Sequence, residues 1–251
     1  MQLVVNNIEK SFGLNRVLRG ASFTFEKGKI YALLGRNGSG KTTLFDLISG
    51  KKDIDSGQVY LREDGKDQPL ENKDIFYMVA NPVLPNFLTG REFLKFFSDV
   101  NKDRIMETRS LDELFDWIDF DTKERDHLIQ TYSLGTKNKI QMLMFILLKP
   151  KVILMDEPLT SLDVVVQLQI KKLLKEIEKD HIIIFSTHIM QLATDICDEI
   201  VIISGGKLYL LPYDKLDNEA FEEKIITILS KDNKEGANEL LKQILEEADN
   251  V

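Results

Sequence analysis

The chain has 251 residues, enough for one large domain or two smaller ones, and its 43% hydrophobic and 29% charged residues are typical of a globular protein. The formal net charge of -8 argues against broad nucleic-acid binding, which needs many Lys and Arg side chains to neutralise phosphates. We find no apolar run of about 18 residues and no signal-peptide pattern. The single cysteine, Cys197, fits a reducing compartment. We therefore expect a cytoplasmic protein that does not itself cross a membrane.

The N-terminal region predicts two short strands. Residues 2–7 and 20–26 alternate apolar and polar side chains. We expect a loop between them that contains Phe12, next to Gly13. Phe12 has two interpretations here, core packing or a platform for an adenine ring, because purines stack well on aromatic rings.

A glycine-rich segment then joins the apolar strand 30–34 to a helical pattern that begins near Lys41. It fits G-x-x-x-x-G-K-[ST], and the flanking strand and helix disfavour the alternative of a turn without a ligand. Backbone N–H groups at such a helix start bind phosphate, Lys41 adds charge near the β and γ phosphates, and the Thr42 hydroxyl completes a Mg²⁺ shell. The expected nucleotide contacts are Gly35, Asn37, Gly38, Ser39, Gly40, Lys41, Thr42 and Thr43.

The middle of the chain predicts turns followed by helices. Residues 50–74 are rich in turns, with a strand at 58–61, and residues 75–79 predict a fully apolar strand. The pattern is then mostly helical to about residue 149. Two apolar stripes predict helices that form the core of a small helical subdomain. They consist of Phe93, Leu94, Phe96, Phe97 and Val100, and of Leu111, Leu114, Phe115 and Ile118.

Ser133 and Gly135 begin another helix, which is densely apolar and ends at Pro150. Ser133 is a candidate N-cap, and Gly135 keeps the helix entrance open to a close neighbour. This helix start is a second candidate for phosphate binding, although Ser-x-Gly before a helix does not by itself decide the matter.

Two apolar strands later in the chain end in polar residues. The strand 152–155 ends in Asp156 and Glu157, an acidic pair that is costly at a strand end unless it meets a cation or a polar ligand. Asp156 is suited to holding Mg²⁺ and Glu157 to orienting or deprotonating water; the alternative is a pair that satisfies free amides at a helix start. The strand 181–186 leads to His188, which can donate to a γ phosphate or hold the attacking water, although a lone histidine is more often structural.

The remaining segments carry less chemistry. Residues 199–204 and 207–211 predict a hairpin across two glycines, and the tail beyond Pro212 reads as charged helix. We expect His127 and His181 to be structural. A helix between the two apolar strands has an apolar face made of Leu168, Ile170, Leu173, Leu174 and Ile177.

Taken in order along residues 1–212, these features resemble the ATP-binding subunits of ABC transporters. The ordered set is more specific than any member. The matching motifs are the aromatic Phe12, Walker A from Gly35 to Thr42, the signature from Ser133 to Thr136, Walker B from Val152 to Asp156 followed by Glu157, the D-loop from Ser161 to Asp163, and the switch His188.

The resemblance implies an α/β fold: a P-loop NTPase core with a mainly parallel sheet, an N-terminal antiparallel β subdomain and a helical subdomain. Residues 1–79 and 150–212 would form the core and residues 80–149 the helical subdomain with the signature. Residues 213–251 would be a C-terminal helical extension.

The resemblance also implies a mechanism. Two subunits close head to tail over two ATP molecules, so that Ser133, Gly135 and Asp163 of one copy meet the nucleotide bound by the other. Partners would be a separate transmembrane permease and a second copy or a paralogous ATPase, with no nucleic acid, and the protein would lie on the cytoplasmic face of the membrane. Lys41, Glu157 and His188 would be catalytic, with Mg²⁺ held by Thr42 and Asp156.

Two motifs, the Q-loop and the signature, depart from the family pattern. Ala80 stands where the Q-loop glutamine is expected, with Asn81 adjacent, and the sequence leaves open whether Asn81 replaces it. In the signature, Leu134 and Thr136 stand where glycine and glutamine are commonest, an irregularity similar to that of export-type subunits with separate permeases. We therefore expect export. The alternatives are a soluble ABC-type ATPase with a mechanochemical or assembly role, and an ATP-binding subunit with feeble hydrolysis.

Overall fold

The computed structural model describes residues 1–105, 107–159, 162 and 164–211. Ser161 and Asp163 of the expected D-loop, and the expected extension 213–251, lie outside the described residues. The strands are β1 (Gln2–Phe12), β2 (Asn15–Glu26), β3 (Lys29–Leu34), β4 (Ser56–Glu63), β5 (Lys66–Pro69), β6 (Ile75–Met78), β7 (Val152–Asp156), β8 (Ile182–Thr187), β9 (Glu199–Ser204) and β10 (Lys207–Leu211). The helices are α1 (Lys41–Ile48), α2 (Gly90–Val100), α3 (Leu111–Trp117), α4 (Leu134–Leu148), α5 (Val164–Ile177) and α6 (Met190–Ile196), with the short 3₁₀ turns η1 (Ile129–Thr131) and η2 (Glu178–Asp180).

A six-stranded sheet forms the centre, in the order β10-β9-β3-β8-β7-β6. Its neighbouring strands are parallel, except that β10 is antiparallel to β9. This confirms the α/β class and the mainly parallel sheet. Because the carboxyl ends of parallel strands meet at one edge, the segments that follow β3, β7 and β8 lie together there.

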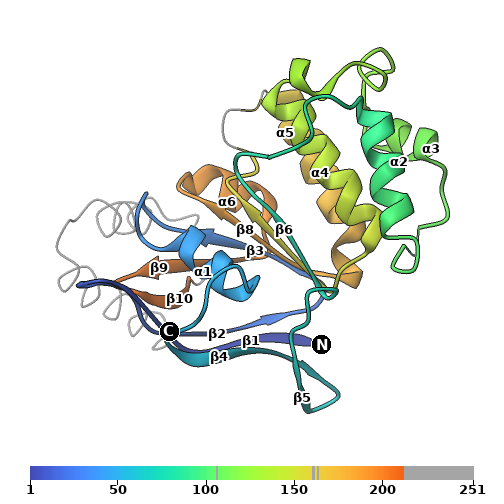
Figure 1. The fold of residues 1–251 in the computed structure, drawn as a ribbon. Coiled ribbons are helices and arrows are strands. Elements are labelled where there is room, and N and C mark those ends of the chain that lie inside the picture. The colour runs from blue at the N-terminus through green and yellow to red at the C-terminus, as the bar shows by residue number, and fades with distance from the viewer. Residues whose placement is uncertain (106, 160–161, 163, 212–251) are drawn as a thin grey trace.

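The two faces of this sheet carry separate cores, because successive side chains of a strand point to opposite faces. Tyr31 and Leu33 pack with α1 and with the second sheet, whereas Ile30, Ala32 and Leu34 pack with the helices of the other face. Figure 1 shows α1 on one side of the sheet, and α4, α5 and α6 on the other. This burial on both faces explains why β3, β7 and β8 are continuously apolar.

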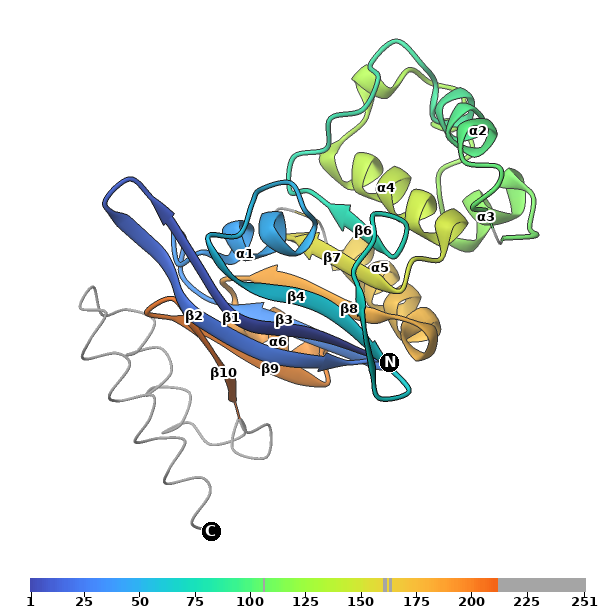
Figure 2. The same cartoon turned by 60° about the horizontal axis from the view of Figure 1, so that its bottom comes forward.

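The second sheet is antiparallel, in the order β2-β1-β4-β5, and lies beside α1 and the central sheet (Figure 2). The strands β1 and β2 are longer than predicted, so Phe12 ends β1 instead of lying in a loop. The hairpin partner β5 was not predicted, because its four residues are polar or proline and all exposed. The Arg19 N–H donates to Gly206 O at 2.9 Å, which ties the antiparallel sheet to the β9–β10 turn.

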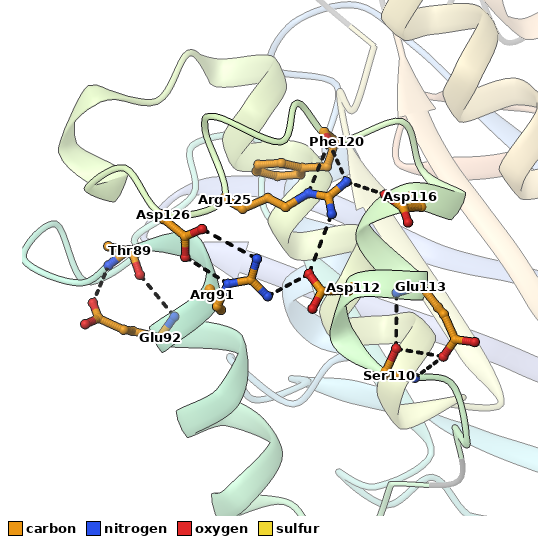
Figure 3. Close-up of polar contacts among 10 residues, drawn as sticks. All are labelled: Thr89, Arg91, Glu92, Ser110, Asp112, Glu113, Asp116, Phe120, Arg125 and Asp126. Carbon is orange, nitrogen blue, oxygen red and sulfur yellow. Dashed lines mark hydrogen bonds and ion pairs between the residues drawn. The ribbon is translucent and has the colours of Figure 1, made fainter.

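The helices α2, α3 and α4 form a lobe at one end of the central sheet (Figures 1 and 2). Capping boxes start two of them: Thr89 with Glu92 at α2, and Ser110 with Glu113 at α3 (Figure 3). The division of the chain at residues 80 and 150 remains a prediction, since the lobe shares one continuous core with the central sheet.

Charged side chains fasten this lobe internally (Figure 3). Arg125 is buried and donates to Phe120 O and to Asp116, while Arg91 bonds Asp112 and Asp126. The guanidinium groups add polar contacts between α2, α3 and the loop that follows, and hydrophobic periodicity in the sequence carries no signal for such contacts.

The burial predicted for some apolar side chains is wrong. Phe96, Val100 and Leu168 are exposed, because Phe93, Leu94 and Ile170 supply the buried faces of their helices and no described element covers the adjacent stripe. In addition, β6 ends at Met78, one residue before the predicted end. Among the described residues, no helix is long and apolar enough to cross a membrane.

Candidate nucleotide site

The phosphate loop follows β3 and leads into α1, at the carboxyl edge of the parallel strands. Gly40 precedes α1 with φ of 111°, a conformation that residues with a Cβ rarely adopt. A Cβ added at Gly35 would lie 2.6 Å from both Ser39 Oγ and Ile203 Cγ2. The loop therefore requires glycine at both positions.

The ammonium of Lys41 lies inside this loop, and the Lys41 side chain is only 6% exposed. Its Nζ donates to Gly35 O at 2.7 Å and to Arg36 O at 3.3 Å. It also forms an ion pair with Glu157 Oε1 at 3.4 Å. Lys41 thus connects the phosphate loop to the end of β7.

Ser39 provides a test of whether the loop fits a phosphate. Its Oγ is buried and has no hydrogen-bond partner within the described part of the chain. A buried hydroxyl without a partner costs free energy, and a phosphate oxygen held by the loop would accept its hydrogen bond. The loop therefore suits a phosphate on grounds independent of its motif.

Asp156 is the buried last residue of β7 and gathers several donors. Thr42 Oγ1 donates to its Oδ2 at 2.8 Å, and Ser186 Oγ donates to its Oδ1 at 2.6 Å. Tyr77 Oη also donates to Oδ2, at 3.4 Å; burial, followed by the charge of Asp156, raises the pKa of this phenol, so it remains a donor. One carboxylate and one hydroxyl side by side suit Mg²⁺, which usually takes its other ligands from water and phosphate.

Glu157 follows with φ of 50°, in the left-handed region. Its N–H donates to Ser186 Oγ at 3.0 Å. Both of its carboxylate oxygens lie 3.1 Å from Nδ1 of His188. The structure therefore brings Lys41, Thr42, Asp156, Glu157 and His188 into one cluster.

Two residues that bond to this cluster, Ser186 and Tyr77, were not among the expected site residues. Neither residue is part of a motif named in the sequence. Their positions held the only signal: Ser186 pairs with Asp156 in the β7–β8 register, and Tyr77 lies on β6, which borders β7. Reading that signal requires knowledge of the strand order.

Ser133 caps α4, as predicted. Its Oγ accepts from Thr136 N at 3.1 Å and bonds Thr136 Oγ1, which also donates to Glu124. Together with Gly135 it borders a hollow of about 330 Å³ that the phosphate loop does not line. Asp119, Asp121 and Glu124 line this hollow beside Lys139, so an anion there meets charges of both signs.

Phe12 is 45% exposed at the end of β1, which excludes core packing. The ammonium groups of Lys10 and Lys52 lie 5.6 and 5.4 Å from its ring centroid. The ring is thus accessible to a planar ligand, with cationic groups close by.

The position where the Q-loop glutamine is expected holds Ala80, followed by Asn81. Asn81 is exposed, and the described contacts of the carboxylate cluster do not include it. Val79 O instead accepts a hydrogen bond from Gln141 of α4 at 3.3 Å. His181 lies apart from the cluster, where Nδ1 bonds Pro150 O and burial lowers its pKa, consistent with a structural role.

Residues 18–160 match the ABC transporter family. This chain belongs to that family. The relative YdbJ of Bacillus subtilis, named as an uncharacterized ABC transporter ATP-binding protein, is 32% identical over 210 residues, 82% of this chain and 67% of the relative. A protein of Chlorella vulgaris named as a probable sulfate/thiosulfate import ATP-binding protein, CysA, is 28% identical over 83% of this chain and 89% of its own length.

A solved structure titled as the ATP binding subunit of an ABC transporter has the same fold. Its TM-score is 0.75 at 22% identity, with 92% of this chain and 100% of that chain covered. The expected P-loop ATPase fold is confirmed. By its family, this ABC protein is an ATP-binding subunit of a transporter and an ATPase. The cited relatives give no support to the expected export type.

Proposed function

We propose that this ABC protein drives a membrane transporter by hydrolysing ATP between two head-to-tail copies. The observation that carries the proposal is the cluster in which Lys41 and His188 both contact Glu157, beside the Asp156–Thr42 pair. A phosphate cradle, a metal-binding pair and a general base are the three parts that phosphoryl transfer to water requires.

Each side chain has a role in this proposal. The phosphate loop and Lys41 bind the phosphates, and Phe12 stacks on the adenine ring. Thr42 and Asp156 hold Mg²⁺, which, when bound, would neutralise charge on the phosphates. Glu157 accepts the proton of the attacking water, and His188 orients that water or the γ phosphate.

The ion pair between Lys41 and Glu157 adds a step that belongs to this chain. Lys41 donates to loop carbonyls and to Glu157 in the structure. A phosphate in the loop competes with Glu157 for the ammonium. Binding ATP therefore frees the Glu157 carboxylate to accept a proton.

We also propose that the site is completed by a second copy. Ser133 and Gly135 border their own hollow, which the phosphate loop does not line, so they can serve a nucleotide held by another chain. Asp163 would act at the same interface. The partner copy is this chain or a paralogous ATPase, and a separate transmembrane permease takes up the motion at the cytoplasmic face of the membrane.

The direction of transport has less support than the coupling to transport. Export follows from the irregular signature at Leu134 and Thr136 alone, and one of the named relatives is an import protein. We therefore propose coupling to transport without assigning a direction.

The test of catalysis is hydrolysis by the purified full chain. Glu157→Gln should slow hydrolysis by about 10²-fold, because a general base is lost, while ATP still binds and traps a dimer visible by analytical ultracentrifugation. Glu71→Gln is the control, because Glu71 is an exposed carboxylate that pairs only with Lys73 among its described partners. Hydrolysis by Glu157→Gln at the wild-type rate would contradict the role of Glu157.

The alternative function is that of a soluble ABC-type ATPase without a transport role. Purification of the tagged chain from membranes separates the two. Co-purification of a protein with several transmembrane spans supports transport, and recovery in the soluble fraction without such a protein contradicts it.

A further inference from the structure

The buried hydroxyl of Ser186 lies between the two carboxylate residues of the site. Ser186 pairs with Asp156 across the β7–β8 register and is 0% exposed. Its Oγ donates to Asp156 Oδ1 at 2.6 Å and accepts from the Glu157 N–H at 3.0 Å. One hydroxyl thus contacts the proposed metal ligand and the backbone of the proposed general base.

The direction of these two bonds is fixed by chemistry. A serine hydroxyl has one hydrogen to donate and lone pairs to accept. The Glu157 N–H can only donate, so the hydroxyl hydrogen of Ser186 must point to Asp156. The chain of bonds therefore runs from Glu157 through Ser186 to Asp156.

This chain of bonds divides the two oxygens of Asp156 between different partners. Ser186 holds Oδ1, whereas Oδ2 receives the hydroxyl of Thr42 at 2.8 Å. Rotation of the carboxylate would break both bonds at once. Ser186 on one side and Thr42 on the other therefore hold the plane of this carboxylate in one orientation.

The same hydroxyl holds Glu157 in an uncommon backbone conformation. Glu157 has φ of 50°, which costs a residue with a Cβ on the order of 1 kcal/mol. The bond from its N–H to Ser186 Oγ helps to retain that conformation. That backbone conformation places the Glu157 side chain against Lys41 and His188.

We propose that Ser186 is a positioning residue for ATP hydrolysis, which holds the metal-side carboxylate of Asp156 and the backbone of Glu157 in one fixed relation. This inference rests on the proposed function. Misplacement of a reacting group by about 1 Å can cost about 10²-fold in rate, so a shared anchor affects turnover strongly. Nucleotide binding depends instead on the phosphate loop and Lys41, whereas the printed bonds of the Ser186 hydroxyl within the described residues go to Asp156 and Glu157.

The test compares Ser186→Ala with Ser186→Thr in the full-length protein. Ser186→Ala should lower kcat by ~10-fold or more, with little change in KM, because positioning and not binding is lost. ATP affinity measured in EDTA should stay within ~2-fold of wild type, since Lys41 and the loop are intact. Ser186→Thr keeps the hydroxyl and should restore most of kcat.

Two further variants sharpen the comparison. Tyr77→Phe removes a longer bond to Asp156 but none to Glu157, so its loss of kcat should be smaller than that of Ser186→Ala. Ser98→Ala removes a buried hydroxyl without a described partner in α2 and should leave kcat unchanged. Equal losses in Tyr77→Phe and Ser186→Ala would show that the Glu157 arm contributes nothing.

A metal-binding measurement keeps the inference separate from the proposed function. Mn²⁺ bound with ATP, followed by electron paramagnetic resonance, should bind Ser186→Ala more weakly than wild type and Ser186→Thr like wild type, whether or not the protein turns over. If wild type fails to hydrolyse ATP, the proposed function falls, and the Mn²⁺ comparison still tests the position of Asp156. The inference is overturned if Ser186→Ala keeps wild-type kcat and Mn²⁺ affinity, or if Ser186→Thr fails as Ser186→Ala does.

Discussion

Lys41 Nζ lies 3.4 Å from Glu157 Oε1, so the ammonium at the phosphate loop and the carboxylate that follows β7 are ion-paired. The two residues are 116 positions apart in sequence and meet because β3 and β7 both flank β8. The pair places Lys41, which we expect to bind phosphate, within reach of Glu157, which we expect to act as the base.

Lys41→Ala should weaken ATP binding by about 10-fold or more, because a charge-assisted bond to phosphate is lost. Isothermal titration in EDTA measures this without hydrolysis. Lys66→Ala, in the exposed strand β5, is the matched control and should bind ATP as wild type does. An unchanged affinity in Lys41→Ala would remove Lys41 from the nucleotide site.

Phe12→Ala should weaken ATP binding by roughly 2- to 10-fold, since an aromatic stacking contact contributes about 0.5–1.5 kcal/mol. Binding of tripolyphosphate, which has no base, should be unaffected, and Phe12→Tyr should bind ATP normally. Phe87→Ala removes another exposed ring and serves as the control. Equal losses of ATP and tripolyphosphate affinity would contradict a stacking role.

Arg125→Ala should lower the free energy of unfolding by about 2 kcal/mol, because Phe120 O loses two hydrogen bonds and the ring of Phe115 loses one of its two cationic neighbours, Arg91 being the other. The partner Asp116 is exposed, so the ion pair itself adds little. Urea denaturation measures the change.

The control for Arg125 is Arg16→Ala, which breaks an exposed ion pair with Glu9 and should cost at most about 1 kcal/mol. Similar losses in the two variants would mean that burial of Arg125 in the helical lobe contributes no stability.

Glu107 should make stability depend on acid pH. Its side chain is 3% exposed and contacts Arg109 and Lys149, and the hydrogen bonds from Arg109 lower the pKa of Glu107 from 4.5 to about 2. Because the folded pKa lies below the unfolded one, this stabilisation is complete above pH 4.5 and is lost as the pH falls toward 2.

Glu107→Gln should therefore be less stable than wild type at neutral pH, and the difference should narrow below pH 4.5. Denaturation curves recorded between pH 7 and pH 3 give this comparison. A difference that stays constant across that range would show that the charge of Glu107 is not responsible.

Local signals in the sequence were sufficient for several elements. The strand β3, the start of α1 at Lys41 and the β9–β10 hairpin follow from apolar runs, glycines and turn chemistry within a few residues of each other. The same applies to the Ser133 cap of α4, since a cap depends on its own helix start. These are short-range effects, so they can be predicted from the sequence alone.

Periodicity was less reliable for burial. It identified α2 and α5 as amphipathic, but Phe96, Val100 and Leu168 are exposed. A helical stripe shows which residues share a face and not which neighbour covers it. The width of the buried face is decided by packing against other elements.

By itself, the sequence determined the motifs of this ABC protein: a glycine loop with Lys41, an acidic pair and a histidine, each beside a strand end. It also predicted that these groups carry the chemistry. The tertiary structure alone decided that these groups meet, that Ser186 stands between Asp156 and Glu157, and that Lys41 pairs with Glu157. The physical reason is strand order. Motifs are set by neighbouring residues along the chain, whereas β7 and β8 become neighbours only when the sheet assembles around its buried core.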